Sequence, residues 1–437
     1  MIAHAIVSLF FFRHPISVSL EESIFRHRSF SVSARQDVFK EWIPLLSSLS
    51  LPWSNVGREK ECRVCGKRSI LISKFVGVCG NCIRERPDEA TPYIIEAHAE
   101  ARSSFGLPAR PPKSPGGIKC NLCSNECEIG VGESGFCGLR ENVDGRLKSL
   151  ASPDRGLLYT YLDPQVTNCC AAWFCPAGTG AGYPKYACKP GPEVGYYNLA
   201  VFFYGCNFDC LFCQNASHKE LWRGDAVTVE EFVGKVRRNE RVSCICYFGG
   251  SPEPQLPFAI KASKTALEEN PKRILRICFE WNGCGHRKLV REAVELALQS
   301  GGNVKFDLKC FNPIMSLALS GVQNERAYEN FRMIAEEIYG ERPSLPVLTA
   351  TTLLVPGYVD SLEVEQIAKF IAELNPEIPY SLLIFHPSFL MADLQVTPYE
   401  QVVDCYKAAK KHLKRVNVGN LSLLGVRDTR KVEAAMR

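Results

Sequence analysis

Three cysteines that follow an apolar run constrain this chain more than any other feature. The run Leu199–Tyr204 has the pattern of a buried strand, and Gly205 after it suits a tight turn. Three cysteines then occur within eight residues: Cys206, Cys210 and Cys213. A cuboidal four-iron cluster normally takes four thiolates, so three indicate one iron left open for a ligand. The alternatives are a zinc site or three reduced thiols beside a core, but this spacing is not usual for zinc.

The same segment resembles the signature of the radical S-adenosylmethionine (SAM) superfamily, with Phe212 as the aromatic residue before the last cysteine. The string Gly-Cys-Asn-x-x-Cys-x-Phe-Cys-Gln-Asn, which begins at Gly205, resembles the branch of pyruvate formate-lyase activating enzymes and Memo-associated radical SAM proteins. The resemblance implies a [4Fe-4S] cluster on Cys206, Cys210 and Cys213 whose open iron chelates SAM. Reductive cleavage of SAM would give a 5′-deoxyadenosyl radical that abstracts hydrogen from a substrate.

The composition is that of a globular protein with an unusual number of cysteines. The 437 residues are 46% hydrophobic and 23% charged, and the net charge of +5 is too small to indicate nucleic-acid binding. Eight of the 21 cysteines form Cys-x2-Cys pairs, which favours metal sites in a reducing compartment over disulfides. The apolar stretch Ala5–Phe12 is too short for a membrane span, and no convincing signal peptide is present. We therefore expect a cytoplasmic protein.

Two Cys-x2-Cys knuckles near the N-terminus predict a zinc ribbon. Thirteen residues separate the first knuckle from the second, which is a spacing typical of a four-thiolate tetrahedral site. The cysteines are Cys62, Cys65, Cys79 and Cys82. We expect structural zinc here, with a recognition role as the alternative.

A second group of four cysteines lies within eighteen residues: Cys120, Cys123, Cys127 and Cys137. The pattern lacks the Cys-Pro ending of ferredoxin runs, so zinc is favoured over an auxiliary iron–sulfur cluster, and both interpretations stay open. The string Cys-x-Leu-Cys, with the later Gly-x-x-Gly-Phe-Cys-Gly-Leu-Arg, resembles the N-terminal segment of the Memo-associated branch. The resemblance thus runs from about Cys120 onward.

Four more cysteines lie in the glycine- and proline-rich stretch Asp163–Tyr197: Cys169, Cys170, Cys175 and Cys188. They form either a further metal site or a set of buried reduced thiols in an irregular lid.

From residue 198 onward, apolar runs alternate with helical stretches, which predicts βαβ units with parallel strands. The expected strands are Leu199–Tyr204, Ser243–Phe248, Ile274–Glu280, Val304–Leu308, Pro346–Leu354 and Ser381–Phe385. The expected helices are Thr228–Arg238 (with a capping box), Gln255–Glu269, Arg287–Leu298, Glu325–Glu337, Leu362–Leu374 and Tyr399–Lys411. These repeats fit an α/β fold of the partial or full (β/α) barrel type, with an open doubly wound sheet as the alternative.

These patterns divide the chain into five parts. Residues 1–55 are an unassigned N-terminal extension, and 56–90 are a zinc ribbon-like module. Residues 91–117 contain a helix and a Pro/Gly linker, and 118–197 are a Cys/Gly-rich region. Residues 198–437 are the α/β barrel that the radical SAM resemblance implies.

A polar or glycine-rich motif follows each predicted strand of the barrel. Because active sites of α/β barrels lie at the C-terminal ends of their strands, we expect these motifs to converge on one mouth above the cluster. The motifs are Cys206–Cys213, Gly249–Pro254, Glu280–His286, Asp307–Lys309, Val355–Gly357 and His386–Ser388.

The motif after the second strand provides candidate contacts to SAM. Two adjacent glycines, Gly249 and Gly250, allow the backbone to approach a ligand closely. The family has Gly-Gly-Glu-Pro here, and this chain inserts Ser251 and Pro252 before Glu253. The resemblance implies that the glycines and Glu253 hold the amino group of SAM, whereas a plain loop is the alternative.

Later strands provide further candidates. Asn282 resembles the family's Asn-Gly on the third strand, which implies contacts to the nucleoside. Asp307 and Lys309 share one face of the fourth strand and match the Asp-x-Lys of activating enzymes, where Lys309 neutralises the SAM carboxylate. A surface ion pair is the alternative for these two residues. His286 and His386 are candidate proton donors or substrate contacts, with a structural role as the alternative.

Four function classes follow from these observations. The resemblance to activating enzymes favours hydrogen abstraction from a protein or peptide, with a reductase, ferredoxin or flavodoxin as electron donor. Radical chemistry on a small molecule, nucleic-acid modification and a non-catalytic iron–sulfur protein are the alternatives. The weak net charge and the lack of a strong basic run argue against nucleic acid. No membrane partner is expected.

Overall fold

The computed structural model describes residues 57–167, 169–425 and 434. Residues from Asn55 onward cluster as one compact unit. The predicted apolar stretch Ala5–Phe12 lies outside the described residues. No helix in the described part of the chain is long and apolar enough to cross a membrane.

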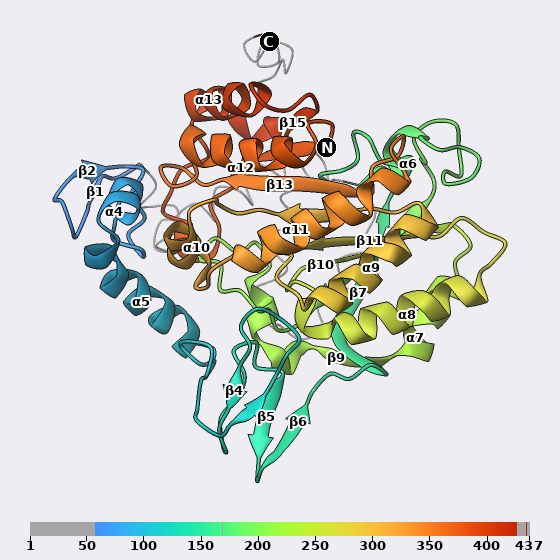
Figure 1. Ribbon diagram of the computed structural model, residues 1–437, viewed down its shortest axis with the longest axis horizontal. Helices are drawn as coiled ribbons and strands as arrows, with labels where there is room; N and C mark the ends of the chain where they lie inside the picture. The colour runs from blue at the N-terminus through green and yellow to red at the C-terminus, as the bar shows by residue number, and fades with distance from the viewer. Residues whose placement is uncertain (1–56, 168, 426–433, 435–437) are drawn as a thin grey trace, which may run out of the picture. The chain divides into compact units, whose positions relative to one another are not determined.

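A nine-stranded sheet forms the centre of this unit, with the order β15-β14-β13-β12-β11-β10-β8-β7-β9 (Figure 1). Neighbouring strands from β8 to β15 are parallel, and each later strand is added on the same side of the sheet. A doubly wound sheet reverses its strand order at a switch point, and this run of strands does not. The sheet is therefore of the barrel type, as predicted, and in the described residues it is an open barrel with β15 and β9 at its edges.

Six of the seven parallel strands in the described residues begin and end close to the predicted positions, and the seventh, β15, has no predicted counterpart. They are β8 (Tyr197–Phe203), β10 (Val242–Phe248), β11 (Arg276–Trp281), β12 (Val304–Asp307), β13 (Leu348–Leu354), β14 (Tyr380–Ile384) and β15 (Val416–Gly419). The antiparallel strands β7 (Arg155–Pro164) and β9 (Asp225–Thr228) extend the sheet beyond β8. Strands β7, β9 and β15 were not predicted, because β9 and β15 have only four residues each and β7 has exposed aromatic residues.

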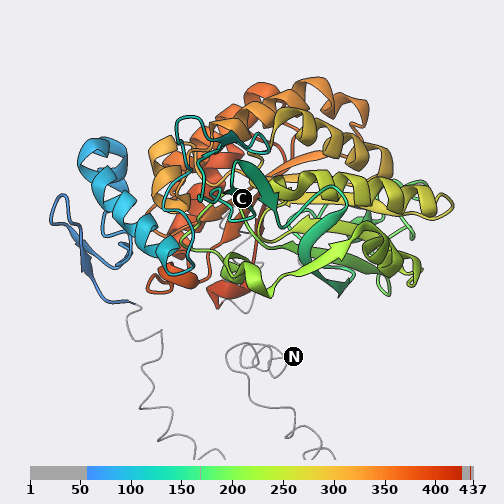
Figure 2. The ribbon, with the colours of Figure 1, turned by 90° about the horizontal axis from the view of Figure 1, so that it is seen from below.

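The helices between the strands follow one another along one side of the sheet, and a view from below shows them as an outer arc (Figures 1 and 2). They are α7 (Val229–Arg237), α8 (Leu256–Glu269), α9 (Arg287–Ser300), α10 (Pro313–Ser320), α11 (Glu325–Glu337), α12 (Ser361–Leu374) and α13 (Tyr399–Lys410). The predicted capping box at the start of α7 is confirmed, since the Thr228 side chain accepts from the Glu231 backbone. Helix α10 was not predicted.

Alternation along the strands separates the two faces of the sheet. On β10, Tyr247 packs against Phe232 of α7, while the residues on either side of it point to the opposite face. Tyr247 also stacks on Phe203 of β8 and Phe279 of β11, so an aromatic core fills the space under the helices. The other face carries polar and thiol side chains, and these line the interior of the barrel.

Smaller elements precede the barrel or connect its parts. The N-terminal elements are β1 (Lys60–Glu61), β2 (Arg68–Ser69), α4 (Gly80–Glu85), α5 (Pro87–Ser103), β3 (Ile118–Lys119), β4 (Glu128–Ile129), β5 (Arg140–Val143), β6 (Arg146–Ser149) and α6 (Pro176–Thr179). The 3₁₀ turns are η2 (Ala216–Lys219), η3 (Leu221–Arg223), η4 (Glu253–Gln255), η5 (Tyr339–Glu341), η6 (Phe389–Met391) and η7 (Leu421–Leu424). Helix α5 begins earlier than predicted because Pro87 suits a first helical position and Asp88 and Glu89 favour a helix N-terminus.

Candidate active site

The loop with the three cysteines leaves β8 through a turn that requires glycine. Gly205 has a φ of 79°, and a Cβ atom on it would lie 2.9 Å from the Cys137 carbonyl oxygen. A side chain would therefore be strained and would collide with the Cys-rich region. The loop is fastened on its other side by Asp209, whose backbone N–H donates to the Ser320 carbonyl over 2.8 Å.

The buried carboxylate of Asp209 anchors this loop through three charged or polar partners. The fully buried carboxylate of Asp209 pairs with Lys219, lies 2.7 Å from His98 Nδ1 and lies 3.5 Å from Arg102 Nη1. Burial acts to raise the pKa of Asp209, but the His98 hydrogen bond and the two cations outweigh it and lower that pKa. Sequence reasoning missed this anchor, because its partners lie on α5 and after the cysteine loop.

A cavity of about 230 Å³ lies at the C-terminal ends of the parallel strands. The three cysteines line it together with five of the predicted SAM-contact residues: Gly249, Gly250, Asn282, Asp307 and Lys309. Residues that the sequence did not single out also line it, including Ser251, Glu280, Lys305 and Thr351. The motifs after the first four predicted strands thus meet at one place.

The spacing of the three sulfurs distinguishes between kinds of metal site. Four sulfurs on one tetrahedral zinc lie about 3.8 Å apart, because each Zn–S bond is about 2.3 Å long. Cys206, Cys210 and Cys213 are not among the described groups whose ligand atoms all lie within 4.8 Å of one another. A cuboidal cluster requires such wider spacing, because each thiolate binds a different iron. The three residues therefore fit a cluster better than a single ion.

The two glycines after β10 are both required by their surroundings. Gly249 has a φ of 71°, and a Cβ there would lie 1.8 Å from a ring carbon of Phe202. Gly250 has a φ of 60°, and a Cβ there would lie 2.0 Å from the Phe203 carbonyl oxygen. The loop after β10 therefore presses bare backbone against β8, directly beside the cysteine loop.

Asn282 joins the third strand to the cysteine loop. Its side-chain amide exchanges two hydrogen bonds with the amide of Asn207, over 2.8 and 3.3 Å. The Asn282 backbone N–H also donates to Ser251 Oγ over 3.1 Å. Ser251, which interrupts the family motif, thus reaches the cavity and supports the turn after β11.

Asp307 and Lys309 form an ion pair at the rim of the cavity. The Lys309 side chain is only 10% exposed, so the pair is not the exposed surface pair considered as an alternative. Burial acts to lower the pKa of Lys309, but the charge of Asp307 outweighs it, so the ammonium stays protonated. A fixed positive charge in this cavity suits a carboxylate ligand.

Glu253 lies outside the cavity lining, in contrast to the other predicted SAM contacts. It is fully buried, and its Oε1 atom accepts from the Gly283 N–H over 2.7 Å. Burial raises the pKa of Glu253 to about 7. Glu253 follows the inserted residues Ser251 and Pro252 and supports the turn that carries Asn282.

The remaining predicted motifs lie elsewhere. The loops 355–357 and 386–388 contribute no residue to the cavity lining. His286 caps α9 by accepting from the Lys288 N–H over 3.3 Å, and His386 lies 3.5 Å from Ser388 Oγ. Neither histidine lines the cavity.

The predicted ribbon cysteines gather as a single-ion site. The sulfurs of Cys62, Cys65, Cys79 and Cys82 all lie within 4.8 Å of one another. The Cys79 N–H also donates to the Cys62 sulfur over 3.3 Å, as is usual for a thiolate ligand. This donor set and spacing fit zinc.

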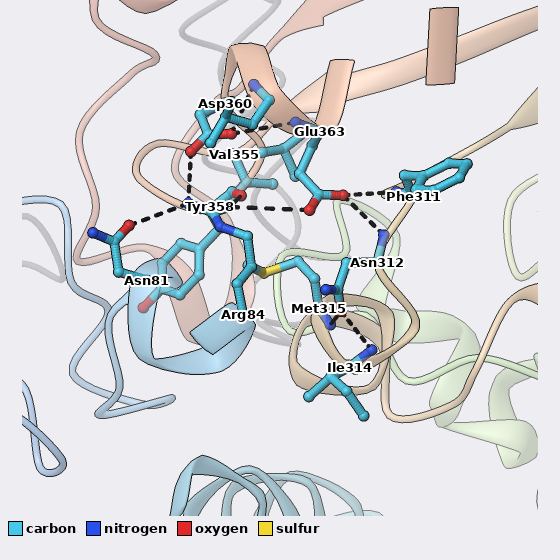
Figure 3. Close-up of polar contacts among 12 residues, drawn as sticks. Asn81, Arg84, Phe311, Asn312, Ile314, Met315, Val355, Tyr358, Asp360 and Glu363 are labelled. Carbon is cyan, nitrogen blue, oxygen red and sulfur yellow. Dashed lines mark hydrogen bonds and ion pairs between the residues drawn. The ribbon is translucent and has the colours of Figure 1, made fainter. Parts of the chain in front are cut away.

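The ribbon is bound to the barrel through α4 (Figure 3). Arg84 donates to Asp360 Oδ2 over 2.7 Å and to the Tyr358 carbonyl over 3.2 Å. Glu363 beside it accepts from the backbone N–H groups of Phe311 and Asn312. The loop after β13 therefore holds the ribbon instead of lining the cavity.

The second predicted group, Cys120, Cys123, Cys127 and Cys137, is not gathered as tightly. It is absent from the described groups whose ligand atoms lie within 4.8 Å of one another. Burial, together with the nearby Cys137, Cys127 and Cys120, raises the pKa of the Cys123 thiol well above its usual value. Their spacing is wider than a single zinc ion requires.

The four cysteines of the irregular stretch separate into different surroundings. Cys169 and Cys170 lie with Glu280 of β11 in a group whose ligand atoms are all within 4.8 Å. Cys188 instead lies near Glu193, which accepts from its backbone N–H over 2.8 Å. Cys175 belongs neither to the group of Cys169, Cys170 and Glu280 nor to the four ribbon cysteines.

Comparisons with known proteins agree with this geometry. Residues 200–371 match the Radical SAM superfamily. An isethionate sulfite-lyase activating enzyme from Desulfovibrio desulfuricans is 35% identical over 139 residues, which are 32% of this chain and 40% of that protein. An uncharacterized protein from Methanocaldococcus jannaschii is 24% identical over 70% of this chain and 81% of its own.

The solved structures that match are more distant. A domain of a pyruvate-formate lyase-activating enzyme from Bacteroides vulgatus is 20% identical, with a TM-score of 0.32, over 40% of this chain and 98% of that one.

Proposed function

We propose that this chain is a radical SAM enzyme of the activating-enzyme-like branch and that it modifies a protein or peptide substrate by hydrogen abstraction. The observation that carries the proposal is the meeting of three widely spaced thiols, a glycine cradle and the Asp307–Lys309 pair on one cavity. When bound, a reduced [4Fe-4S] cluster and SAM together supply a 5′-deoxyadenosyl radical at this place.

Different residues of the cavity would bind the iron–sulfur cluster and SAM. Cys206, Cys210 and Cys213 would hold the cluster through their three thiolates. Lys309 offers its ammonium to the SAM carboxylate, and Asp307 holds that ammonium in position. The bare backbone of Gly249 and Gly250 forms the wall nearest to the cysteine loop, where a side chain would exclude the ligand.

The protein substrate is supported by the names of two relatives, an isethionate sulfite-lyase activating enzyme and a glycyl-radical enzyme activating enzyme. A reductase, ferredoxin or flavodoxin would supply the electron. Radical chemistry on a small molecule is the second candidate, since the cavity itself is small.

The two N-terminal cysteine groups differ in the metal that we propose for them. The tight gathering of Cys62, Cys65, Cys79 and Cys82 supports zinc. Cys120, Cys123, Cys127 and Cys137 are not gathered within the same limit, so we propose either zinc or an auxiliary iron–sulfur cluster for them.

Anaerobic turnover tests the proposal. The full chain is reconstituted with iron and sulfide, reduced with dithionite and mixed with SAM, and 5′-deoxyadenosine is quantified. We expect product from the wild type and from Cys405→Ala, which removes a buried thiol of α13 away from the cavity, but none from Cys210→Ala. Equal product from Cys210→Ala, or none from a fully loaded wild type given candidate substrates, would contradict the proposal.

A further inference from the structure

A second group of reactive side chains adjoins the cavity, and the proposed radical chemistry does not use it. The ligand atoms of Cys169, Cys170 and Glu280 all lie within 4.8 Å of one another. The cysteines come from the segment between β7 and β8, whereas Glu280 lies on β11, so folding brings distant parts of the chain together. We propose that these three residues bind a zinc ion and that a donor atom of the substrate completes its coordination.

Cys170 is held in position by the strands behind it, and the Ala171 N–H donates to the Cys169 sulfur over 3.4 Å. Thr351 of β13 donates its hydroxyl to the Cys170 sulfur over 3.2 Å. Ser381 of β14 donates to the Cys170 carbonyl over 2.9 Å, and Trp173 Nε1 donates to Ser381 Oγ over 3.0 Å. A donor aimed at a thiolate and a rigid strand beneath it are the features that orient metal ligands in proteins.

The charges of the group are balanced by a divalent ion. With an ion bound, the two thiolates and the carboxylate would carry three negative charges, of which the buried Lys305 ammonium balances one. Lys305 lies 3.7 Å from the Glu280 carboxylate, and its charge lowers the pKa of Cys169. Zn²⁺ supplies the remaining two charges, which matters because uncompensated charge is costly in a buried site.

One of the three proposed ligands, Glu280, lines the reaction cavity, whereas Cys169 and Cys170 lie behind it and do not. Glu280, Lys305 and Thr351 all line the cavity of about 230 Å³ that the three cluster cysteines also line. The Glu280 side chain is 33% exposed, whereas Lys305 is 1% exposed, so the carboxylate is the member that faces open space. Zinc with three protein ligands keeps a fourth position for water or substrate, as in catalytic sites. The ion would thus position a thiolate, carboxylate or amine donor of the substrate near SAM.

The inference does not depend on the proposed radical chemistry, and its test needs no turnover. Crystals of the full wild-type chain are grown with zinc, and anomalous differences are measured at the zinc edge. We expect one peak among the four ribbon sulfurs, which serves as an internal control, and one among Cys169, Cys170 and Glu280. A ribbon peak without the second peak, or a disulfide between Cys169 and Cys170 in its place, would overturn the inference.

Metal content in solution gives a second test with matched variants. Cys169→Ser/Cys170→Ser should bind one zinc fewer per chain than the wild type, whereas Cys405→Ser should bind the same amount. Thr351→Val keeps the shape and all three ligands but removes a hydrogen bond to one of them, so its zinc affinity against a competing chelator should fall about 10–100-fold. Unchanged zinc content in the double variant together with unchanged affinity in Thr351→Val would refute the site.

Discussion

Asp209→Asn changes a single side-chain atom but should strongly lower the free energy of unfolding. The Asp209 carboxylate is 0% exposed, and its partners Lys219 and Arg102 are each 1% exposed. The substitution keeps the shape of the side chain but leaves two buried cations without a counter-charge. Breaking a buried pair by removing one partner costs about 3–5 kcal/mol, so we expect the free energy of unfolding to fall by this amount.

The matched control for this change is Asp154→Asn. Asp154 also pairs with a lysine, Lys261, but the two side chains are 73% and 51% exposed. Exposed pairs contribute about 0–1 kcal/mol, so the control should unfold almost like the wild type. Urea unfolding of the chain without iron, followed by circular dichroism, measures both variants. Because Asp209 holds the cysteine loop, iron content after reconstitution should also fall in Asp209→Asn alone. A difference of less than 1 kcal/mol between the two variants would refute the reasoning.

Three further predictions concern the cavity wall, the ribbon and acid stability. Gly250→Ala should lower the free energy of unfolding by at least about 1–2 kcal/mol, because alanine is strained in the left-handed backbone conformation of this position. It should also weaken SAM binding, measured by equilibrium dialysis. Unchanged binding would contradict the role of Gly249 and Gly250 as a wall of the SAM site. Tyr358→Phe leaves the Ser73 N–H and the Val78 carbonyl of the ribbon without their partner, and each loss should lower the free energy of unfolding by about 1–3 kcal/mol. Tyr183→Phe, at a half-exposed position, should leave that free energy unchanged in a urea titration. Burial acts to raise the pKa of Glu193, but its hydrogen bonds and ion pair with Arg276 outweigh it and lower that pKa. Its stabilisation is therefore complete above the unfolded carboxyl pKa of about 4.3 and is lost as the pH falls below that value. Glu193→Gln should be less stable at pH 7 but lose less stability on acidification, and parallel loss in both proteins would exclude this group as the cause.

The barrel could be predicted from the sequence because its signals are local. Each buried parallel strand is a short apolar run, and the Thr228 capping box lies within four residues. The same holds for the three cysteines and the glycine pair, which follow their strands directly. Strand β15 was missed because its four residues include Asn417 and are only half-buried, so no apolar run marks it.

The missed parts of the site depend on contacts between distant segments. Nothing near Asp209 indicates that His98 and Arg102 of α5 will surround it. The pairing of Cys170 with Glu280 is equally invisible in the sequence, because one lies in an irregular segment and the other in a strand. Its motif predicted Glu253 in the cavity, but the side chain lies outside the lining and accepts from the Gly283 N–H.

The segments before residue 198 are as much a part of the site as the barrel itself. Helix α5 supplies His98 to the Asp209 anchor, and Asn125 of the Cys-rich region donates to the Asn207 carbonyl over 2.8 Å. The Cys137 carbonyl fills the space that a side chain at position 205 would need. All of these contacts are to the cysteine loop and most of them are buried, so its conformation depends on residues from both sides of the 197/198 boundary. The sequence divides the chain there, but the packing that holds the proposed cluster does not.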